Sequence, residues 1–315
     1  MRYLLRRLVW MAAALLGVSV LIFLLVRLLP GTIIDILAGT EGQLSREQRL
    51  QILHSFGLDR PLPVQYVLWA WNLLHGNLGW SFRTSQPVAP LLVSRLPVTV
   101  ELAMLSAACV TLLGLPLGIV ASVTRSVRLK GFVQVVGLLG LSIPNFWIAL
   151  ALIILASYAF RWGPALIYVP PWQDPWVNAQ QMFLPVLSLA LGLAAVVLRM
   201  TRSSMLEVLG QEYVKVARAK GLAGRTVLMR HALRNALIPI VTVLGLQTGF
   251  LLGGVVINEE IFGLPGLGWT LLNGVYQRDY PVIQGAVMLF AATFVAINLL
   301  VDLAYTYLDP RIRFQ

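Results

Sequence analysis

Long apolar runs alternate with short polar segments along the whole chain. Six of the runs are long enough to form helical spans, at residues 8–29, 98–123, 132–160, 183–200, 237–257 and 282–307. A helix needs about 20 apolar residues to cross a hydrocarbon core of about 30 Å. The pattern therefore predicts an all-α polytopic membrane protein with six transmembrane helices.

Glycine and proline interrupt two of the predicted spans. Gly114, Pro116 and Gly118 lie within the second span, where they permit a kink and a close approach of helices. Residues 143–145 interrupt the third span, and Pro144 among them removes a backbone hydrogen bond. We expect this interruption to bend the third helix near the middle of the membrane, where a bend can shape a pathway.

The polar segments suggest three parts. Residues 1–29 hold a basic tail and the first span, which is too long for a signal peptide and has no small-residue cleavage site. Residues 30–96 are polar and rich in turns, and we expect a small helical cap outside the membrane. Residues 97–315 form the helical core, within which residues 202–236 are a basic region between the fourth and fifth spans.

Composition and charge agree with a membrane protein. Hydrophobic residues make up 58% of the chain and charged residues 12%, and the net charge is +11. The basic residues gather in short segments at 2–7, 125–130, 199–234 and 311–313, whereas an outer loop is expected to hold Glu259, Glu260 and Asp279. By the positive-inside rule, both termini and the stretch 212–239 are predicted to be cytoplasmic.

The sequence offers no catalytic, metal or nucleotide site. The three histidines, His54, His75 and His231, are far apart, and the single Cys109 lies in an apolar span. No stretch matches the phosphate-binding pattern GxxxxGK[ST], so the chain is not expected to bind ATP by itself. Charged residues such as Glu101 and Asp302 lie at span ends, which disfavours an ion-coupled carrier.

The stretch 212–239 is the largest polar interruption in the apolar pattern and is strongly basic. It is predicted to form two short helices joined at residues 221–224. In the first, Val214, Ala217 and Gly221 recur at helical spacing and give a narrow face of small residues. Such a helix suits a groove on another protein. The alternative is a solvated loop that obeys the positive-inside rule.

Sequence motifs recur along nearly the whole chain. They are FGLDRPLPVQY (56–66), GNLGWSF (76–82), IPNFW (143–147), RSSMLEVLGQEYVKVARAKGL (202–222), HALRNALIP (231–239), GFLLGGVVINEEIFGLPGLG (249–268), RDYPVIQG (278–285) and NLLVDLAYTYLDPRIR (298–313). Through this set, which is highly specific when taken together, the chain resembles the permease subunits of bacterial ATP-binding-cassette importers, in particular the first permease of the dipeptide, oligopeptide and nickel branch. The resemblance implies the fold of a type I importer permease.

The resemblance implies that 202–236 contains the EAA loop, whose coupling helix inserts into a cleft on an ATPase subunit. Gly221, Ala217 and Leu233 match the loop pattern, whereas Lys215 replaces its glutamate and Arg234 its proline. Val216 and His231 replace its first alanine and its isoleucine. The residues expected to couple to the ATPase are Glu212, Tyr213, Lys215, Ala217, Arg218, Ala219, Lys220, Gly221 and Leu222. The candidates for the translocation path are Pro144, Asn145, Gln247, Gly253, Gly254 and Asn258.

The resemblance also implies partners and a location. These are a related second permease, two ATPase subunits that bind ATP and magnesium, and an extracytoplasmic solute-binding protein, all at the bacterial inner membrane. Dipeptides and oligopeptides are the expected cargo, with nickel, metal chelates or glutathione as alternatives. A stand-alone channel, an ion-coupled carrier and a membrane scaffold or receptor are the alternatives from other classes.

Overall fold

The computed structural model of the chain describes residues 2–28, 47, 59–165 and 167–308. The backbone packs into two compact units, which are described separately. Unit 1 comprises residues 1–96 and 270–295, and unit 2 comprises residues 97–269 and 296–315. Of residues 30–58, which form the first part of the predicted cap, only residue 47 is described. These units are defined by packing. They do not test the predicted division into residues 1–29, 30–96 and 97–315.

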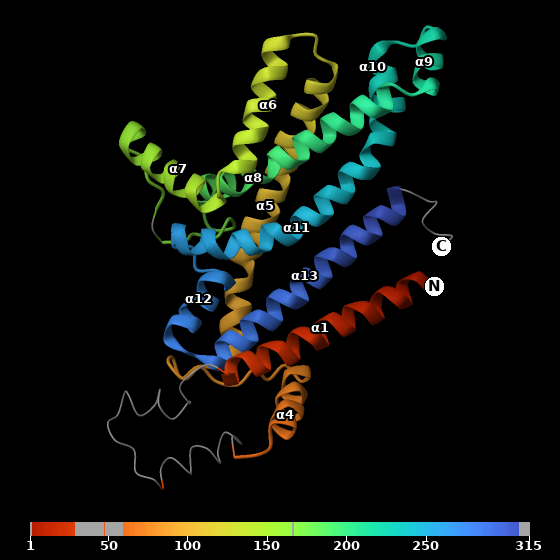
Figure 1. Ribbon diagram of the computed structural model, residues 1–315. Coiled ribbons are helices and arrows are strands. Elements are labelled where there is room, and N and C mark those ends of the chain that lie inside the picture. Colours follow the sequence, from red (N-terminus) through yellow and green to blue (C-terminus); the bar gives the residue numbers. More distant parts are fainter. Residues whose placement is uncertain (1, 29–46, 48–58, 166, 309–315) are drawn as a thin grey trace. The chain divides into compact units, whose positions relative to one another are not determined.

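Every regular element in the described part of the chain is a helix (Figure 1). The elements are α1 (Arg2–Leu28), α4 (Leu62–Leu74), α5 (Val88–Val123), α6 (Val127–Ser142), α7 (Asn145–Phe160), α8 (Pro175–Leu209), α9 (Glu212–Ala219), α10 (Gly224–Thr226), the π-helix η1 (Val227–Leu233), α11 (Arg234–Phe262), α12 (Leu267–Gln277) and α13 (Tyr280–Leu308). Five helices are long and apolar enough to cross a membrane, and α6 with α7 makes a sixth span if the pair is counted as one. The predicted all-α membrane fold is confirmed.

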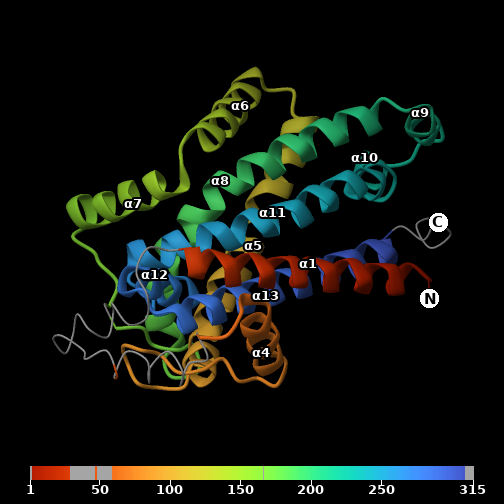
Figure 2. The same ribbon diagram turned by 60° about the horizontal axis from the view of Figure 1, so that its bottom comes forward.

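Helix α8 forms the centre of unit 2. Its apolar residues are the most buried of the candidate spans, because α6, α7 and α11 all pack against it. Figures 1 and 2 both show α11 running beside α8. The largest core cluster joins α5, α8 and α11 through Val98, Leu102, Val110, Met182, Leu189, Leu193, Val197, Leu251 and Val255, with Leu264 beyond α11.

The predicted close approach of the second span has a partner in α8. A Cβ atom built on Gly114 would lie 2.8 Å from the Cβ of Val197, and one built on Gly118 would lie 2.5 Å from the Cβ of Thr201. Both distances are too short for real carbon atoms, so only glycine fits at these two positions while the helices keep their spacing. Pro97 and Pro116 are accommodated within α5 without ending it.

The third predicted span is broken rather than bent. Helix α6 ends at Ser142, α7 begins at Asn145, and the two axes differ by 108° (Figure 2). Pro144, with extended backbone angles, is the N-cap of α7, and it has no N–H group to continue the hydrogen-bond ladder of α6. The break places residues 143–145 at an exposed turn of backbone beside α8.

In unit 1, α1 packs against α4, and a second apolar cluster joins them to the beginning of α13. The buried members are Ile22, Val26, Tyr280 and Ile283, with Trp69, Phe82 and Leu271 against them. The Nε atom of Arg27 donates to Oε1 of Gln65 at 3.0 Å, and Arg27 also stacks on Phe23. The hydroxyl of Ser81 and the backbone N–H of Phe82 donate to the carboxylate of Asp279. These bonds fix the turn 76–87 to the turn before α13.

Two features of the outer segments differ from the prediction. The loop expected after the fifth span contains helix α12, and α11 extends to Phe262, so Glu259 lies in its last turn. Helix α12 has 11 residues, too few to cross a membrane, so a search for long apolar runs did not find it.

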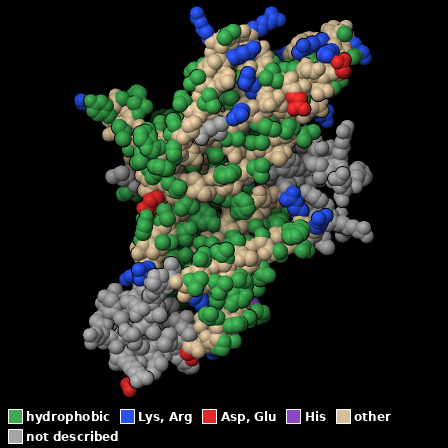
Figure 3. Space-filling view, viewed as in Figure 1, with side chains coloured by type: hydrophobic (Ala, Val, Ile, Leu, Met, Phe, Trp, Pro, Cys, Tyr) green, Lys and Arg blue, Asp and Glu red, His purple; other side chains and the backbone are tan. Residues whose placement is uncertain are grey.

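Lys and Arg side chains gather at one end of unit 2, over α9, α10 and the turn between α5 and α6 (Figure 3). Hydrophobic side chains cover the flanks of the helices below. This separation is typical of a protein whose basic end meets the cytoplasm.

Candidate functional site

Helix α9 is held against its own chain by its small residues. Val214 and Ala217 are buried, and they form a cluster with Val227 of η1, against which Val208 and Leu209 of α8 also pack. Val214 and Ala217 thus pack within the chain, and the prediction that α9 contacts a partner stays a prediction. The helical spacing identified the buried face correctly, but that face packs within the chain.

The opposite face of α9 is open to solvent. Tyr213, Val216 and Leu222 expose 43%, 51% and 41% of their surface. The charged neighbours are exposed too, and Lys215 pairs with Glu212 at 2.8 Å. The remaining predicted coupling residues, Arg218, Ala219, Lys220 and Gly221, are also exposed. We call this set, Glu212, Tyr213, Lys215, Val216 and Arg218 to Leu222, the exposed face of α9.

Gly221 ends α9 by its backbone conformation. Its φ angle is +74°, in the left-handed region that favours glycine. The N–H of Gly221 donates to the carbonyl of Arg218, and the N–H of Leu222 donates to that of Ala217. This pair of bonds is a Schellman motif, which closes the last turn of a helix. A Cβ atom on Gly221 would meet nothing within 4 Å, so its requirement is conformational.

The second predicted short helix is not separate. Helix α10 continues through η1 into α11, so residues 224–262 form one helix with a π-helical segment near its start. Side chains hold α9 to this helix at a second point, where the Nδ2 of Asn235 donates to the hydroxyl of Tyr213 at 2.8 Å. Helix α9 is therefore connected both to η1, by packing, and to α11, by this hydrogen bond.

A cavity of about 780 Å³ lies in unit 2, where α6, α7, α8 and α11 meet. It is lined by Gly140, Ile143, Pro144, Asn145, Phe146, Gly192, Leu193, Val196, Gln247, Gly249, Phe250, Gly253, Gly254, Ile257 and Asn258. All six residues predicted for a pathway are among them. The fold thus brings the break at 143–145 next to the glycine-rich part of α11, although whether a solute passes there stays a prediction.

Asn258 is the most buried polar residue of the cavity wall, with 1% of its surface exposed. Its Nδ2 donates to the carbonyl of Pro185 at 2.9 Å and to the hydroxyl of Ser188 at 2.7 Å. The Oδ1 atom is buried and has no hydrogen-bond partner.

A buried carboxylate next to this wall was missed by the sequence analysis, which placed Glu259 in a loop. Glu259 is fully buried; it accepts from the Thr99 hydroxyl at 2.6 Å and from the N–H groups of Gly268 and Trp269 at 2.7 and 3.0 Å. It thereby caps the first turn of α12. A Cβ atom on Gly266 would overlap this carboxylate. A glutamate a few residues before the turn GLPGLG was the available signal.

The loop before α8 is also tied to the helices of unit 2. The hydroxyl of Tyr168 donates to Oε2 of Glu101 at 2.6 Å, and burial together with this carboxylate raises the pKa of Tyr168. Tyr168 therefore stays protonated and remains a hydrogen-bond donor.

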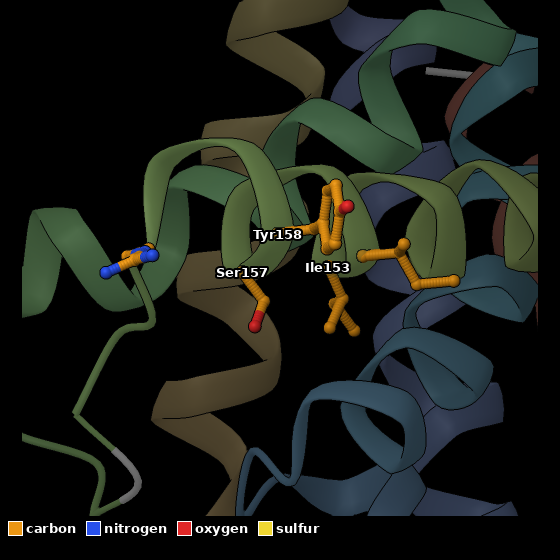
Figure 4. A pocket seen from close by; sticks show the side chains of 5 residues that line it. Ile153, Ser157 and Tyr158 are labelled. Atoms are coloured by element: carbon orange, nitrogen blue, oxygen red, sulfur yellow. The ribbon is translucent and has the colours of Figure 1, made fainter.

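A third feature of unit 2, a hollow on α7, does not have the character of a site. Ile153, Ile154, Ser157, Tyr158 and Arg161 line it, all from one helix and its C-cap, and Figure 4 shows Ile153, Ser157 and Tyr158 along the same turns. Within the described residues, no group of three or more His, Cys, Asp or Glu side chains could hold a metal ion.

Comparison with known proteins gives consistent matches. Residues 114–314 match the family "Binding-protein-dependent transport system inner membrane component", and residues 1–103 match the N-terminal family of the same transport systems. A putative peptide transport system permease protein of Brucella abortus (strain 2308) is 42% identical over 99% of this chain and 98% of its own. The dipeptide transport system permease protein DppB of Escherichia coli (strain K12) is 39% identical over 99% of both chains.

The fold is also similar to a solved structure. A chain from the inward-facing MetNI methionine ABC transporter (CY5 SeMet soak crystal form) matches with a TM-score of 0.58 and 19% identity, over 70% of this chain and 96% of that one. This similarity supports the importer permease fold. The family match and the full-length relatives together show that the chain belongs to the binding-protein-dependent transport system inner membrane components, as a permease subunit and not an enzyme in its own right.

Proposed function

We propose that this chain is one of two transmembrane subunits of an ATP-driven importer for dipeptides and short oligopeptides. The observation that carries the proposal is the similarity, at 39–42% identity over 99% of the chain, to relatives named as peptide and dipeptide permeases. The similarity extends across the cap segment and the helical core alike.

The proposed transporter has four kinds of subunit. A related second permease pairs with this chain, two ATPase subunits bind ATP and Mg²⁺, and an external solute-binding protein delivers the peptide. ATP can drive alternation only if it binds one conformation of the assembly more tightly than the other. This chain would contribute half of the pathway and one coupling helix.

The exposed face of α9 is the proposed contact with the ATPase. It presents Tyr213, Val216 and Leu222 among basic side chains, and exposed apolar groups of this kind are typical of a helix that docks in a groove. Its connection to α11 through the Val214–Val227 contact and the Asn235–Tyr213 hydrogen bond supports a role in transmitting motion.

The cavity at the break between α6 and α7 is the proposed part of the pathway. Its walls combine glycines with the carboxamides of Asn145, Gln247 and Asn258. In this orientation both termini and α9 lie in the cytoplasm, an assignment supported by the basic end of unit 2 in Figure 3.

The cavity lining also bears on the alternative cargoes. Nickel is commonly bound by imidazole nitrogen atoms, whereas the cargo proposed here carries peptide groups. The lining residues include neither His, Cys, Asp or Glu nor Lys or Arg. The carboxamides match peptide groups instead, which favours peptides over nickel.

The experiment is uptake into proteoliposomes that contain the complete transporter. Labelled dialanine and trialanine should enter only when the binding protein and ATP are present, whereas nickel and glutathione should remain at the level of empty vesicles. Uptake of peptide without the ATPases would instead support a channel or carrier. ATP-dependent uptake of nickel or glutathione, with none of peptide, would overturn the peptide assignment.

A further inference from the structure

Helix α4 is too short to cross a membrane, yet it is apolar along its whole length. Its 13 residues make a helix about 20 Å long, whereas the hydrocarbon core is about 30 Å thick. The helix contains no charged residue. A helix that is hydrophobic all round is stable only where its surroundings are apolar on every side.

Only one face of α4 packs on its own chain. Tyr66 and Trp69 of this face stack around Phe23 of α1. The opposite face has no such cover, and its side chains each expose between 41% and 80% of their surface. They are Val64, Val67, Leu68, Trp71 and Leu74, which share one side of the helix by their spacing, and we call them the open face of α4. Hydrophobic side chains over α4 are also visible in Figure 3.

The contacts with α1 indicate the depth at which α4 lies. Arg27 is in the last turn of α1 and donates to Gln65, and a guanidinium group is costly inside hydrocarbon, so this end of α4 is at the level of the lipid headgroups. Deeper along α1, the hydroxyls of Ser19 and Tyr66 form a hydrogen bond of 2.8 Å. From Ser19 to Arg27 the helix rises about 12 Å, less than half of a core of about 30 Å. These contacts therefore lie within one leaflet.

A cavity on the other side of α4 is also suited to hydrocarbon. It has a volume of about 470 Å³ and is lined from α1, α4 and α13, with Leu78 beyond the end of α4. Ser19 and Tyr66 carry the polar side-chain groups of its wall, and these bond to each other; the remaining lining residues are alanine, leucine, methionine and Gly285. A water molecule needs two to four polar partners, which this wall does not offer.

The composition of the open face distinguishes lipid from a protein partner. Protein interfaces include hydrogen-bonding groups at about one bond per 100–200 Å². On the open face the only polar side-chain group is the indole N–H of Trp71, a residue type that is enriched where membrane meets water. Branched aliphatic side chains without donors or acceptors match acyl chains, which have none either.

We propose that α4 is embedded in the membrane along one leaflet, with its open face against lipid acyl chains. In the proposed orientation this is the outer leaflet. Helix α4 then anchors the segment between the first two spans to the membrane surface. The bonds of Ser81 and Phe82 to Asp279 connect that segment to the start of α13, so the anchor also fixes the level of this end of the span.

The test uses the complete transporter in lipid nanodiscs, without the binding protein. In a Cys109→Ser background, Val67→Cys carries an environment-sensitive fluorophore, which is quenched either by lipids with a nitroxide on the acyl chain or by iodide in the water. We expect a blue-shifted emission that is lost with the nitroxide lipid and kept with iodide. Val64→Cys, at another position of the open face, replaces Val67→Cys if that variant does not assemble.

Thr84→Cys is the matched control, because Thr84 is exposed in the turn 76–87 of the same unit. Its fluorophore should be quenched by iodide and spared by the nitroxide lipid. Iodide quenching at Val67 would overturn the proposal, since the open face would then be in water. Protection from both quenchers would also overturn it, because another subunit would then cover the face. Equal lipid quenching at Val67 and Thr84 would do the same, as the open face would be no deeper than the turn.

Discussion

Single residues decide how the two ends of α11 are held. Near the start of α11, Ala217 is buried because α9 lies close to Val227, and Gly221 is needed for its positive φ angle. At the other end, Glu259 offers three acceptor bonds to Thr99 and the start of α12. The sequence pattern could identify Gly221 and Ala217 as special, because helical spacing is visible in one dimension. It could not show Glu259 as buried, because its partners lie far along the chain.

Replacement of Glu259 by alanine should destabilise the protein. The variant removes the acceptor of the Gly268 and Trp269 N–H groups and of the Thr99 hydroxyl, and we expect a loss of roughly 3 kcal/mol in the free energy of unfolding. The measurement is the midpoint of thermal unfolding in detergent. Glu260→Ala is the matched control, since Glu260 carries the same charge on the next residue but is exposed. Equal midpoints for the two variants would contradict the capping role.

At the scale of elements, the apolar pattern predicts the long spans, but it does not predict where the helices end or the angles between them. The runs at 98–123 and 183–200 correctly located α5 and α8, but both helices extend beyond these runs, α5 from Val88 and α8 from Pro175 to Leu209. The break at Pro144 was predicted as a bend, because a sequence does not reveal the 108° angle set by packing on α8. The helical spacing located the small-residue face of α9, but it could not show that Val214 and Ala217 pack on η1, since a small-residue face packs equally well within a chain or on a partner.

The exposed face of α9 gives a prediction about coupling. Val216→Asp places a charge at an exposed position of α9, so the fold should be kept while docking on the ATPase is weakened. We expect at least a tenfold loss of ATP-driven uptake, about 1.4 kcal/mol of docking energy, and less ATPase subunit co-purified with this chain. Val127→Asp is the control, because Val127 is an exposed valine at the start of α6. Normal uptake and co-purification for Val216→Asp would exclude this face as the contact.

At the scale of the whole molecule, the fold class and family could be predicted from the sequence because long spans and short motifs are both local features. The residues that line the cavity could be predicted only as separate candidates, without their arrangement around one space. Pro144 and Asn258 lie 114 positions apart, and only packing on α8 brings them to one wall. The orientation in the membrane still rests on charge.

Cysteine labelling tests this orientation. In a Cys109→Ser background, Arg128→Cys should react with a membrane-impermeant maleimide only after the cytoplasmic side is opened, and Trp172→Cys should react in intact spheroplasts. Both positions are exposed and lie at the ends of helices in unit 2, so accessibility reports the side of the membrane. The reverse pattern would invert the assignment of α9 to the cytoplasm.

The π-helix η1 has a mechanical consequence. Its seven residues, Val227–Leu233, include the contact with α9 at Val227 and lead directly into α11, which carries Gln247 and Asn258. A π-helical turn holds one residue more than an α-helical turn, so a return to α-helical hydrogen bonding would shift the register by one residue, or about 100° of rotation. A movement of α9 can thus rotate α11 about its own axis by one discrete step. This rotation would change the direction in which the carboxamides of Gln247 and Asn258 face.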